Sequence, residues 1–88
     1  MVEKRVIVKA HAKERLNREK LYNVDEQVLI KIVKNPDELV YGRGNRLIAH
    51  KVLDKNYILR VVYEEFADQI QIVTFYRAKK ERYYGGGK

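Results

Sequence analysis

Hydrophobic and polar residues alternate at the start of the chain, and this pattern predicts a strand over residues 2–10. One face of the strand carries Val2, Val6, Val8 and Ala10, with Lys4 as the exception. Residues 11–22 follow and favour a helix. The apolar face of this helix is thin, because Ala12 and Leu16 are its main members. The sequence therefore predicts a first strand followed by a weakly amphipathic helix.

A second helix is the clearest amphipathic element in the sequence. Its apolar face carries Val28, Leu29, Ile32 and Val33. Asn23 is a favourable N-cap, and Glu26 stands three residues later, as in a capping box. The helix should end by Asn35, because Pro36 disfavours helical backbone in the residue before it.

Short strands and turns make up the rest of the chain. The predicted strands are residues 39–41, 46–53, 57–66 and 70–76, and the predicted turns are residues 42–45, 54–56 and 67–69. The resulting order, β-α-α-β-β-β-β, predicts an α+β fold with two N-terminal helices packed on a curved antiparallel sheet. We expect one domain over residues 1–84 and a flexible C-terminal tail over residues 85–88.

The charge of the chain changes this picture, because it is basic and unevenly spread. The 19 Lys and Arg residues outnumber the 12 Asp and Glu residues, which gives a formal net charge of +7. Residues 1–22 and residues 76–88 each carry a net charge of +4, whereas residues 23–75 carry −1. A fold that brings the two ends together would form a positive face that attracts phosphates. A basic surface that serves only solubility is the alternative.

Several classes of function are disfavoured by residues that the sequence lacks. It has no Cys, which excludes disulfides, zinc knuckles, iron–sulfur clusters and thiol catalysis. Its two histidines, His11 and His50, do not have the spacing of metal ligands, so we expect no metal and no cofactor. The first residues are not typical of a signal peptide, and no apolar run is long enough to span a membrane. We therefore expect a cytoplasmic protein.

Three stretches of the sequence resemble a known family. They are His11-Ala12-x-x-Arg15 followed by Arg18, then Leu59-Arg60-Val61-Val62-Tyr63, and finally the basic, tyrosine-rich residues 77–84. Together with the order of elements, they resemble the RelE/ParE superfamily of small toxins. The opening His-x-x-x-Arg and Asn35-Pro36 are most similar to a branch of uncharacterised function, and the tail is similar to that of BrnT toxins.

The resemblance implies RNA or the ribosome as the target and a metal-independent endoribonuclease activity on messenger RNA. Carried over residue by residue, it assigns catalytic roles to Arg60, Arg77 and Tyr83, with Tyr84 as a possible equivalent of Tyr83. RelE-type enzymes often place further lysines or a glutamate in the strand before Arg60, where this chain offers only His50 and Lys51. ParE-type members poison gyrase instead, so the fold does not choose the chemistry.

Further basic and aromatic residues are candidates for nucleic-acid contacts. They are His11, Arg15, Arg18, Lys79, Lys80, Arg82 and Tyr84, and Tyr22 extends the stripe on the first helix. Arginine binds phosphate oxygens through two parallel hydrogen bonds, and tyrosine rings stack on unpaired bases. The alternatives are a solvated helix face and a solvated tail, and for Arg60 a structural ion pair with Glu64 or another carboxylate.

Two other functions remain open at this point. One is a non-catalytic nucleic-acid-binding module, which the net charge alone would support. The other is a protein-interaction domain, for instance the folded partner of an acidic antitoxin, as the resemblance implies for toxins of this class.

Overall fold

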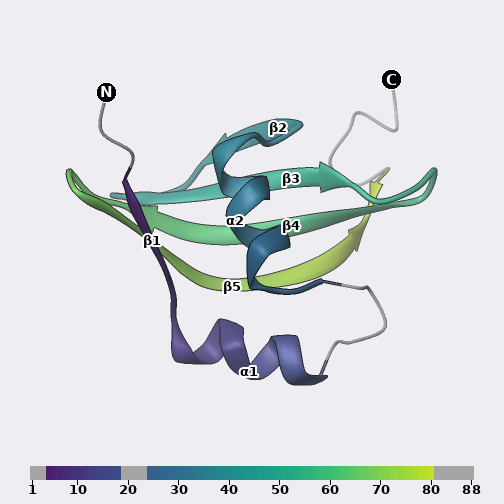
Figure 1. Ribbon diagram of the computed structural model, residues 1–88. Helices are drawn as coiled ribbons and strands as arrows, with labels where there is room; N and C mark the ends of the chain where they lie inside the picture. The colour runs from purple at the N-terminus through teal and green to yellow at the C-terminus, as the bar shows by residue number, and fades with distance from the viewer. Residues whose placement is uncertain (1–3, 19–23, 81–88) are drawn as a thin grey trace.

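The computed structural model describes residues 4–18 and 24–80. Its elements are β1 Arg5–Val8, α1 Ala10–Arg18, α2 Glu26–Lys34, β2 Glu38–Tyr41, β3 Arg46–Val52, β4 Tyr57–Glu65 and β5 Gln69–Lys79. This order agrees with the predicted β-α-α-β-β-β-β (Figure 1). Residues 85–88, predicted to be a tail, lie outside the described residues.

The five strands form one sheet in the order β1-β5-β4-β3-β2, and its strands curve around the helices (Figure 1). β2 to β5 are an antiparallel meander, as predicted. The prediction of a wholly antiparallel sheet is wrong, because β1 pairs parallel to β5, with Val6 opposite Ile70 and Val8 opposite Ile72. The alternation of residues shows which face of a strand is apolar, but it does not show the direction of the neighbouring strand. The fold is therefore α+β with a mixed sheet.

α2 begins with a different capping residue from the one predicted. Asp25 caps α2, and its carboxylate accepts a hydrogen bond from the backbone N–H of Val28 at 3.0 Å. The predicted cap, Asn23, lies outside the described residues, and Glu26 is the first residue of the helix. α2 ends at Lys34, before Pro36, as expected. No helix in the described part of the chain is long and apolar enough to cross a membrane.

The hydrophobic core lies between the helices and one face of the sheet. Its members include Ala12 of α1, Leu29 of α2, Leu59 and Val61 of β4, and Phe75 of β5. On β4 the alternate residues point the other way, so Arg60 lies on the face away from the helices. We call it the open face because none of the described helices lies on it, although Ile58, Arg60 and Val62 are buried there. The sheet thus separates an apolar helix side from an open face that carries a buried arginine.

β5 contains a bulge that changes which residues face the core. Val62 lies opposite Thr74 and Tyr63 lies opposite Ile72, so Val73 is the extra residue. Ile72 and Phe75 are therefore both in the core, and Tyr76 lies on the open face beside Arg60. β5 also runs to Lys79 and not to residue 76, so Arg77 and Lys79 belong to a strand and not to a tail.

Replacing Leu29 by Ala should lower the free energy of unfolding by about 3–5 kcal/mol, because it leaves a cavity in the core. Leu29 is fully buried, whereas Tyr41 is 76% exposed and provides the control. Urea denaturation should show a change of less than about 0.5 kcal/mol for Tyr41→Ala. Equal losses for the two variants would contradict the position of the core.

Candidate functional site

One residue from each of four neighbouring strands forms a row across the open face of the sheet. Glu38 of β2 lies opposite His50 of β3, His50 lies opposite Arg60 of β4, and Arg60 lies opposite Tyr76 of β5. Because directly opposed residues share a face, all four side chains lie on the same side. We call these four residues the polar row.

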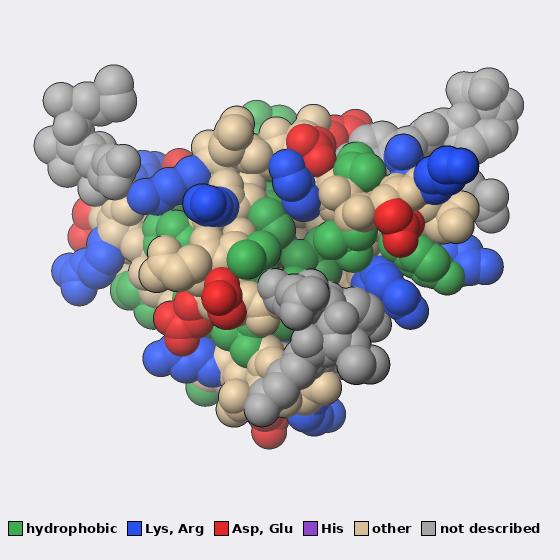
Figure 2. Space-filling view, turned by 45° about the vertical axis from the view of Figure 1, so that its right-hand side comes forward, with side chains coloured by type: hydrophobic (Ala, Val, Ile, Leu, Met, Phe, Trp, Pro, Cys, Tyr) green, Lys and Arg blue, Asp and Glu red, His purple; other side chains and the backbone are tan. Residues whose placement is uncertain are grey.

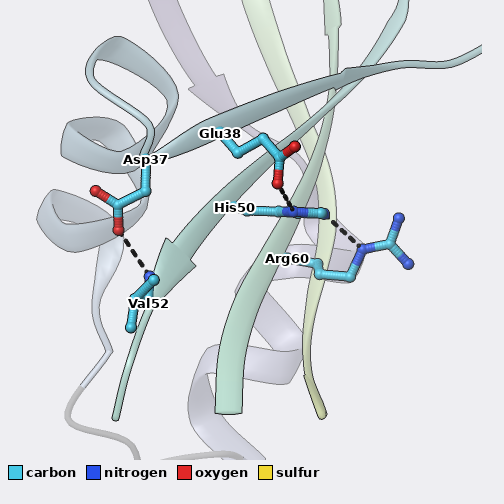
Figure 3. A network of polar contacts seen from close by, with 5 residues as sticks. All are labelled: Asp37, Glu38, His50, Val52 and Arg60. Carbon is cyan, nitrogen blue, oxygen red and sulfur yellow. Dashed lines mark hydrogen bonds and ion pairs between the residues drawn. The ribbon is translucent and has the colours of Figure 1, made fainter. Parts of the chain in front are cut away.

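Two hydrogen bonds and a close contact between an imidazole and a carboxylate connect the side chains of the polar row. Arg60 donates from Nε to Nε2 of His50 at 3.0 Å, and from Nη1 to the hydroxyl of Tyr76 at 2.5 Å. Nδ1 of His50 lies 3.6 Å from Oε1 of Glu38. Figure 3 shows the imidazole between the carboxylate and the guanidinium. The guanidinium carbon also lies 5.3 Å from the centre of the Tyr76 ring, within the range of a cation–π contact.

These contacts determine where the proton of His50 lies. Arginine Nε can only donate a hydrogen bond, so Nε2 of His50 must accept it and carries no proton. Nδ1 therefore carries the proton and faces Glu38. Burial lowers the pKa of His50 below 6.5, and the charge of Arg60 lowers it further, while Glu38 partly opposes both effects. His50 is thus a neutral imidazole at neutral pH.

The polar row gives Arg60 a defined orientation. His50 is 1% exposed and Arg60 is 9% exposed, so both side chains are surrounded by protein. Tyr76 is only half-buried, and the row therefore comes nearer to the surface at its Tyr76 end. At the opposite end, the carboxylate of Asp37 accepts a hydrogen bond from the backbone N–H of Val52 at 2.8 Å, which ties the start of β2 to the end of β3 (Figure 3). The row can present a positioned cation beside a hydroxyl group.

The sheet separates two of the residues that the resemblance assigns to catalysis. Arg77 lies opposite Leu59, a core residue, so it is on the helix side, whereas Arg60 is on the open face. The guanidinium of Arg77 packs on the ring of Tyr57, 4.3 Å from its centre. The third predicted catalytic residue, Tyr83, lies outside the described residues. The structure therefore does not bring Arg60 and Arg77 into one site.

The predicted nucleic-acid contacts on α1 lie away from the polar row. His11 and Arg18 are exposed on α1 and Arg15 is half-buried there, and α1 packs against β5 on the helix side. Arg18 lies 3.8 Å from Glu14 in an exposed ion pair. Lys79 is exposed opposite Tyr57, and the backbone N–H of Lys80 bonds to the carbonyl oxygen of Asn56 at 2.7 Å. The positions of Tyr22, Arg82 and Tyr84 lie outside the described residues.

Sequence reasoning missed two members of the polar row and one ion pair. Glu38 was expected to precede its strand, but β2 begins at this residue. Tyr76 reaches the open face because of the bulge at Val73, which the sequence pattern did not indicate. Glu64, which was considered as a partner of Arg60, contacts Arg46 at 3.3 Å. One sequence feature did point to the polar row: His50 is a candidate residue in the strand before Arg60.

Searches of protein-family models, curated proteins and solved structures found no match to this chain. The relationship to RelE/ParE toxins therefore stays a prediction. Within residues 4–18 and 24–80, the structure has no group of three His, Cys, Asp or Glu side chains that could hold a metal ion.

The protein should lose stability as the pH falls below about 6.5, because the pKa of His50 is lower in the folded chain than in the unfolded chain. The unfolded chain then takes up a proton that the folded chain does not, and protonated Nε2 can no longer accept from Arg60. Chemical denaturation between about pH 7.5 and about pH 5.5 measures this loss of unfolding free energy.

His50→Gln is the matched variant, because its amide oxygen can still accept from Arg60 but the side chain does not titrate. The loss of stability over the same pH range should be smaller in this variant. An equal loss in both proteins would show that His50 is not its source.

Proposed function

We propose that this protein is a homologue of the RelE/ParE toxins that binds RNA, with Arg60 holding a backbone phosphate. Arg60 is 9% exposed, so the phosphate would reach it beside the half-buried Tyr76, where the polar row comes nearest to the surface. The observation that carries the proposal is the orientation of Arg60 by His50 and Tyr76. A guanidinium whose rotamer is already fixed loses less entropy when it binds a phosphate. The element order and the placement of both helices on one face also support the relationship.

The charge of the chain supports the same proposal at longer range. A net charge of +7 steers a polyanion toward the protein, and the release of counterions adds to the affinity. This effect is not specific to one site. It therefore explains how RNA is attracted to the protein, but not where on the protein it binds. Arg60 would then supply the position, because its partners hold it in one place on the sheet.

A second candidate function, metal-independent cleavage of the bound RNA, is favoured by the position of Tyr76. Its hydroxyl accepts a hydrogen bond from Arg60, so its own proton points away from the guanidinium. The ribose 2′-hydroxyl would attack the neighbouring phosphorus and lose its proton to water, and the bond to the 5′-oxygen would break. Arg60 would stabilise the charge on the phosphate oxygens, and Tyr76 would donate its proton to the leaving 5′-oxygen. Tyr76, and not Tyr83, would then be the tyrosine that takes part in the reaction.

RNA binding should weaken at least about fivefold in Arg60→Gln, because a charge-assisted hydrogen bond to phosphate is lost. The measurement is the fluorescence anisotropy of a labelled single-stranded oligoribonucleotide over a range of salt concentrations. Arg60→Gln should also reduce the slope of log affinity against log salt by about one. Circular dichroism checks that the variant is folded.

Arg43→Gln is the matched control, because it removes the same charge from an exposed turn. It should bind the oligoribonucleotide nearly as tightly as the wild type. If the two variants weaken binding equally, the effect comes from net charge, and Arg60 is not the phosphate site.

Tyr76→Phe should reduce RNA cleavage at least about tenfold beyond any loss of RNA binding, because it removes the proton donor, while His50 and the ring of residue 76 still contact the guanidinium. The protein is induced in growing cells without any partner, and growth and messenger RNA integrity are followed. Tyr41→Phe is the control, because Tyr41 is exposed.

The outcomes of this experiment separate the alternatives. Cleavage by the wild type but not by Tyr76→Phe would support a ribonuclease toxin. Growth arrest with intact RNA would point to a gyrase-type target. Soluble wild-type protein that has no effect on growth would favour a non-catalytic nucleic-acid-binding module.

A further inference from the structure

β2 forms one edge of the sheet, and only its β3 side is paired with a strand among the described residues. The sheet order ends at β2, and Figure 1 shows this strand at the upper rim of the molecule. Figure 2 shows hydrophobic side chains and side chains of both charges at the surface along this rim. β2 contains no proline and no lysine, two residues that commonly protect an edge from pairing with another chain. Tyr41, at its end, is 76% exposed.

The hydrogen bonds between β2 and β3 show which backbone groups of β2 face outward. The N–H of Gly42 donates to the carbonyl oxygen of Arg46 at 2.9 Å, and this pair lies one step beyond Tyr41 in the register. Hydrogen-bonded and non-hydrogen-bonded pairs alternate along an antiparallel ladder. The N–H and C=O groups of Val40 therefore face β3, whereas those of Leu39 and Tyr41 face away from it. A strand that pairs with β2 would form its hydrogen bonds with Leu39 and Tyr41.

The charges at the two ends of β2 favour a second copy of this chain as that strand. Asp37 precedes β2 and Arg43 follows it. If Leu39 bonds with Tyr41 of an antiparallel second copy, the Val40 residues of both copies meet at the twofold axis. The same register places Asp37 of each copy opposite Arg43 of the other, on the same face of the sheet. Opposite charges therefore meet at both ends of such an interface.

The other edge strand, β1, does not favour pairing with a second copy. Lys4 and Arg5 lie at its start, and Lys9 follows its end. Glu65 contacts Lys4 at 2.7 Å, but no acidic residue stands between residues 4 and 9 of the chain. An antiparallel copy of β1 would therefore bring like charges together.

We propose that two copies of this chain associate through β2 and join their five-stranded sheets into one continuous sheet. The outward N–H and C=O groups of Leu39 and Tyr41 bond with the same groups of the other copy. Tyr41 also covers Leu39 of the other copy on the helix side, where Leu39 packs against the core. Because residues directly opposite each other share a face, the open faces of both copies lie on the same side. The association does not depend on RNA binding.

The association should be weak, because two short strands bury little area. We expect half of the protein to be dimeric at a concentration between about 10 µM and about 1 mM. Below this range the chain is monomeric, and substitutions in β2 then act only within one chain. Sedimentation equilibrium over this range should show an average mass that rises from that of one chain, 10.5 kDa, toward twice that value. A chain that stays monomeric at about 1 mM would overturn the proposal.

Val40→Cys tests the register, because the chain has no cysteine of its own. The Cα atoms of a non-hydrogen-bonded antiparallel pair are about 4.5 Å apart, which is within the range of a disulfide. Oxidation by glutathione should join two copies, and non-reducing electrophoresis measures the rate. Lys13→Cys, on an exposed part of α1, is the control and should cross-link at least about tenfold more slowly. Equal rates for the two variants would show that β2 is not paired in this way.

Arg43→Glu tests the charges at the ends of the interface. It should weaken the association at least about fivefold, because two acidic side chains then face each other. Lys13→Glu carries the same charge change on α1 and should strengthen the association slightly, because it reduces the repulsion between two chains of net charge +7. The two variants should thus shift the dimerisation constant in opposite directions. A shift in the same direction would overturn the contact between Asp37 and Arg43.

Two further measurements separate this proposal from RNA binding. Protein treated with ribonuclease should associate as strongly as untreated protein. Arg60→Gln should associate as the wild type does, even if its RNA binding is lost or was never present. Loss of the dimer in either experiment would show that RNA bridges the two copies, and it would overturn direct pairing through β2.

Discussion

The extra residue in β5, Val73, determines which side chains of the last strand meet the core and which meet the open face. Without a bulge, strict alternation from Ile72 would place Thr74 and Tyr76 toward the helices and Phe75 away from them. The bulge reverses this arrangement, so that Phe75 fills the core and Tyr76 lies beside Arg60. The core and the polar row therefore depend on the same irregularity, and neither could form in the other register.

The polar row also explains how a cation can remain in the middle of a largely apolar strand. Ile58 and Val62 flank Arg60 on the same face of β4 and are buried, so water contributes little to its solvation. The imidazole of His50 and the hydroxyl of Tyr76 replace part of that solvation with oriented dipoles. Glu38 lies on the other side of His50 from Arg60. Its carboxylate favours the tautomer of the imidazole in which Nε2 accepts the hydrogen bond from Arg60.

Much of the fold could be predicted from the sequence, because its elements have clear local signals. The apolar face of α2 identified the core residue Leu29, and the alternation along β4 placed Leu59 and Val61 together on the face opposite to Arg60. The parallel pairing of β1 with β5 could not be predicted, because it depends on contacts between distant segments and not on local alternation.

The candidate site was less accessible to sequence reasoning. Arg60 could be predicted, since a charged residue in an apolar strand is conspicuous by itself. Arg60 and Arg77 lie on opposite faces of the sheet because of the register between β4 and β5. This register could not be predicted from the sequence. Glu38 and Tyr76 are ordinary in the sequence and become relevant only through the residues opposite them.

The parallel pairing of β1 with β5 has a consequence for the order of folding events. Arg5 lies opposite Gln69, so this contact closes almost the largest loop that the described chain permits. β2, β3, β4 and β5 are joined by short turns and can assemble by local hairpin formation, which is fast. On a ribosome, β1 emerges before the other strands of this sheet but cannot pair with β5 until β5 has been synthesised. Of the strands of this sheet, β1 is thus expected to be the last to join, and α1 is expected to complete its packing only then.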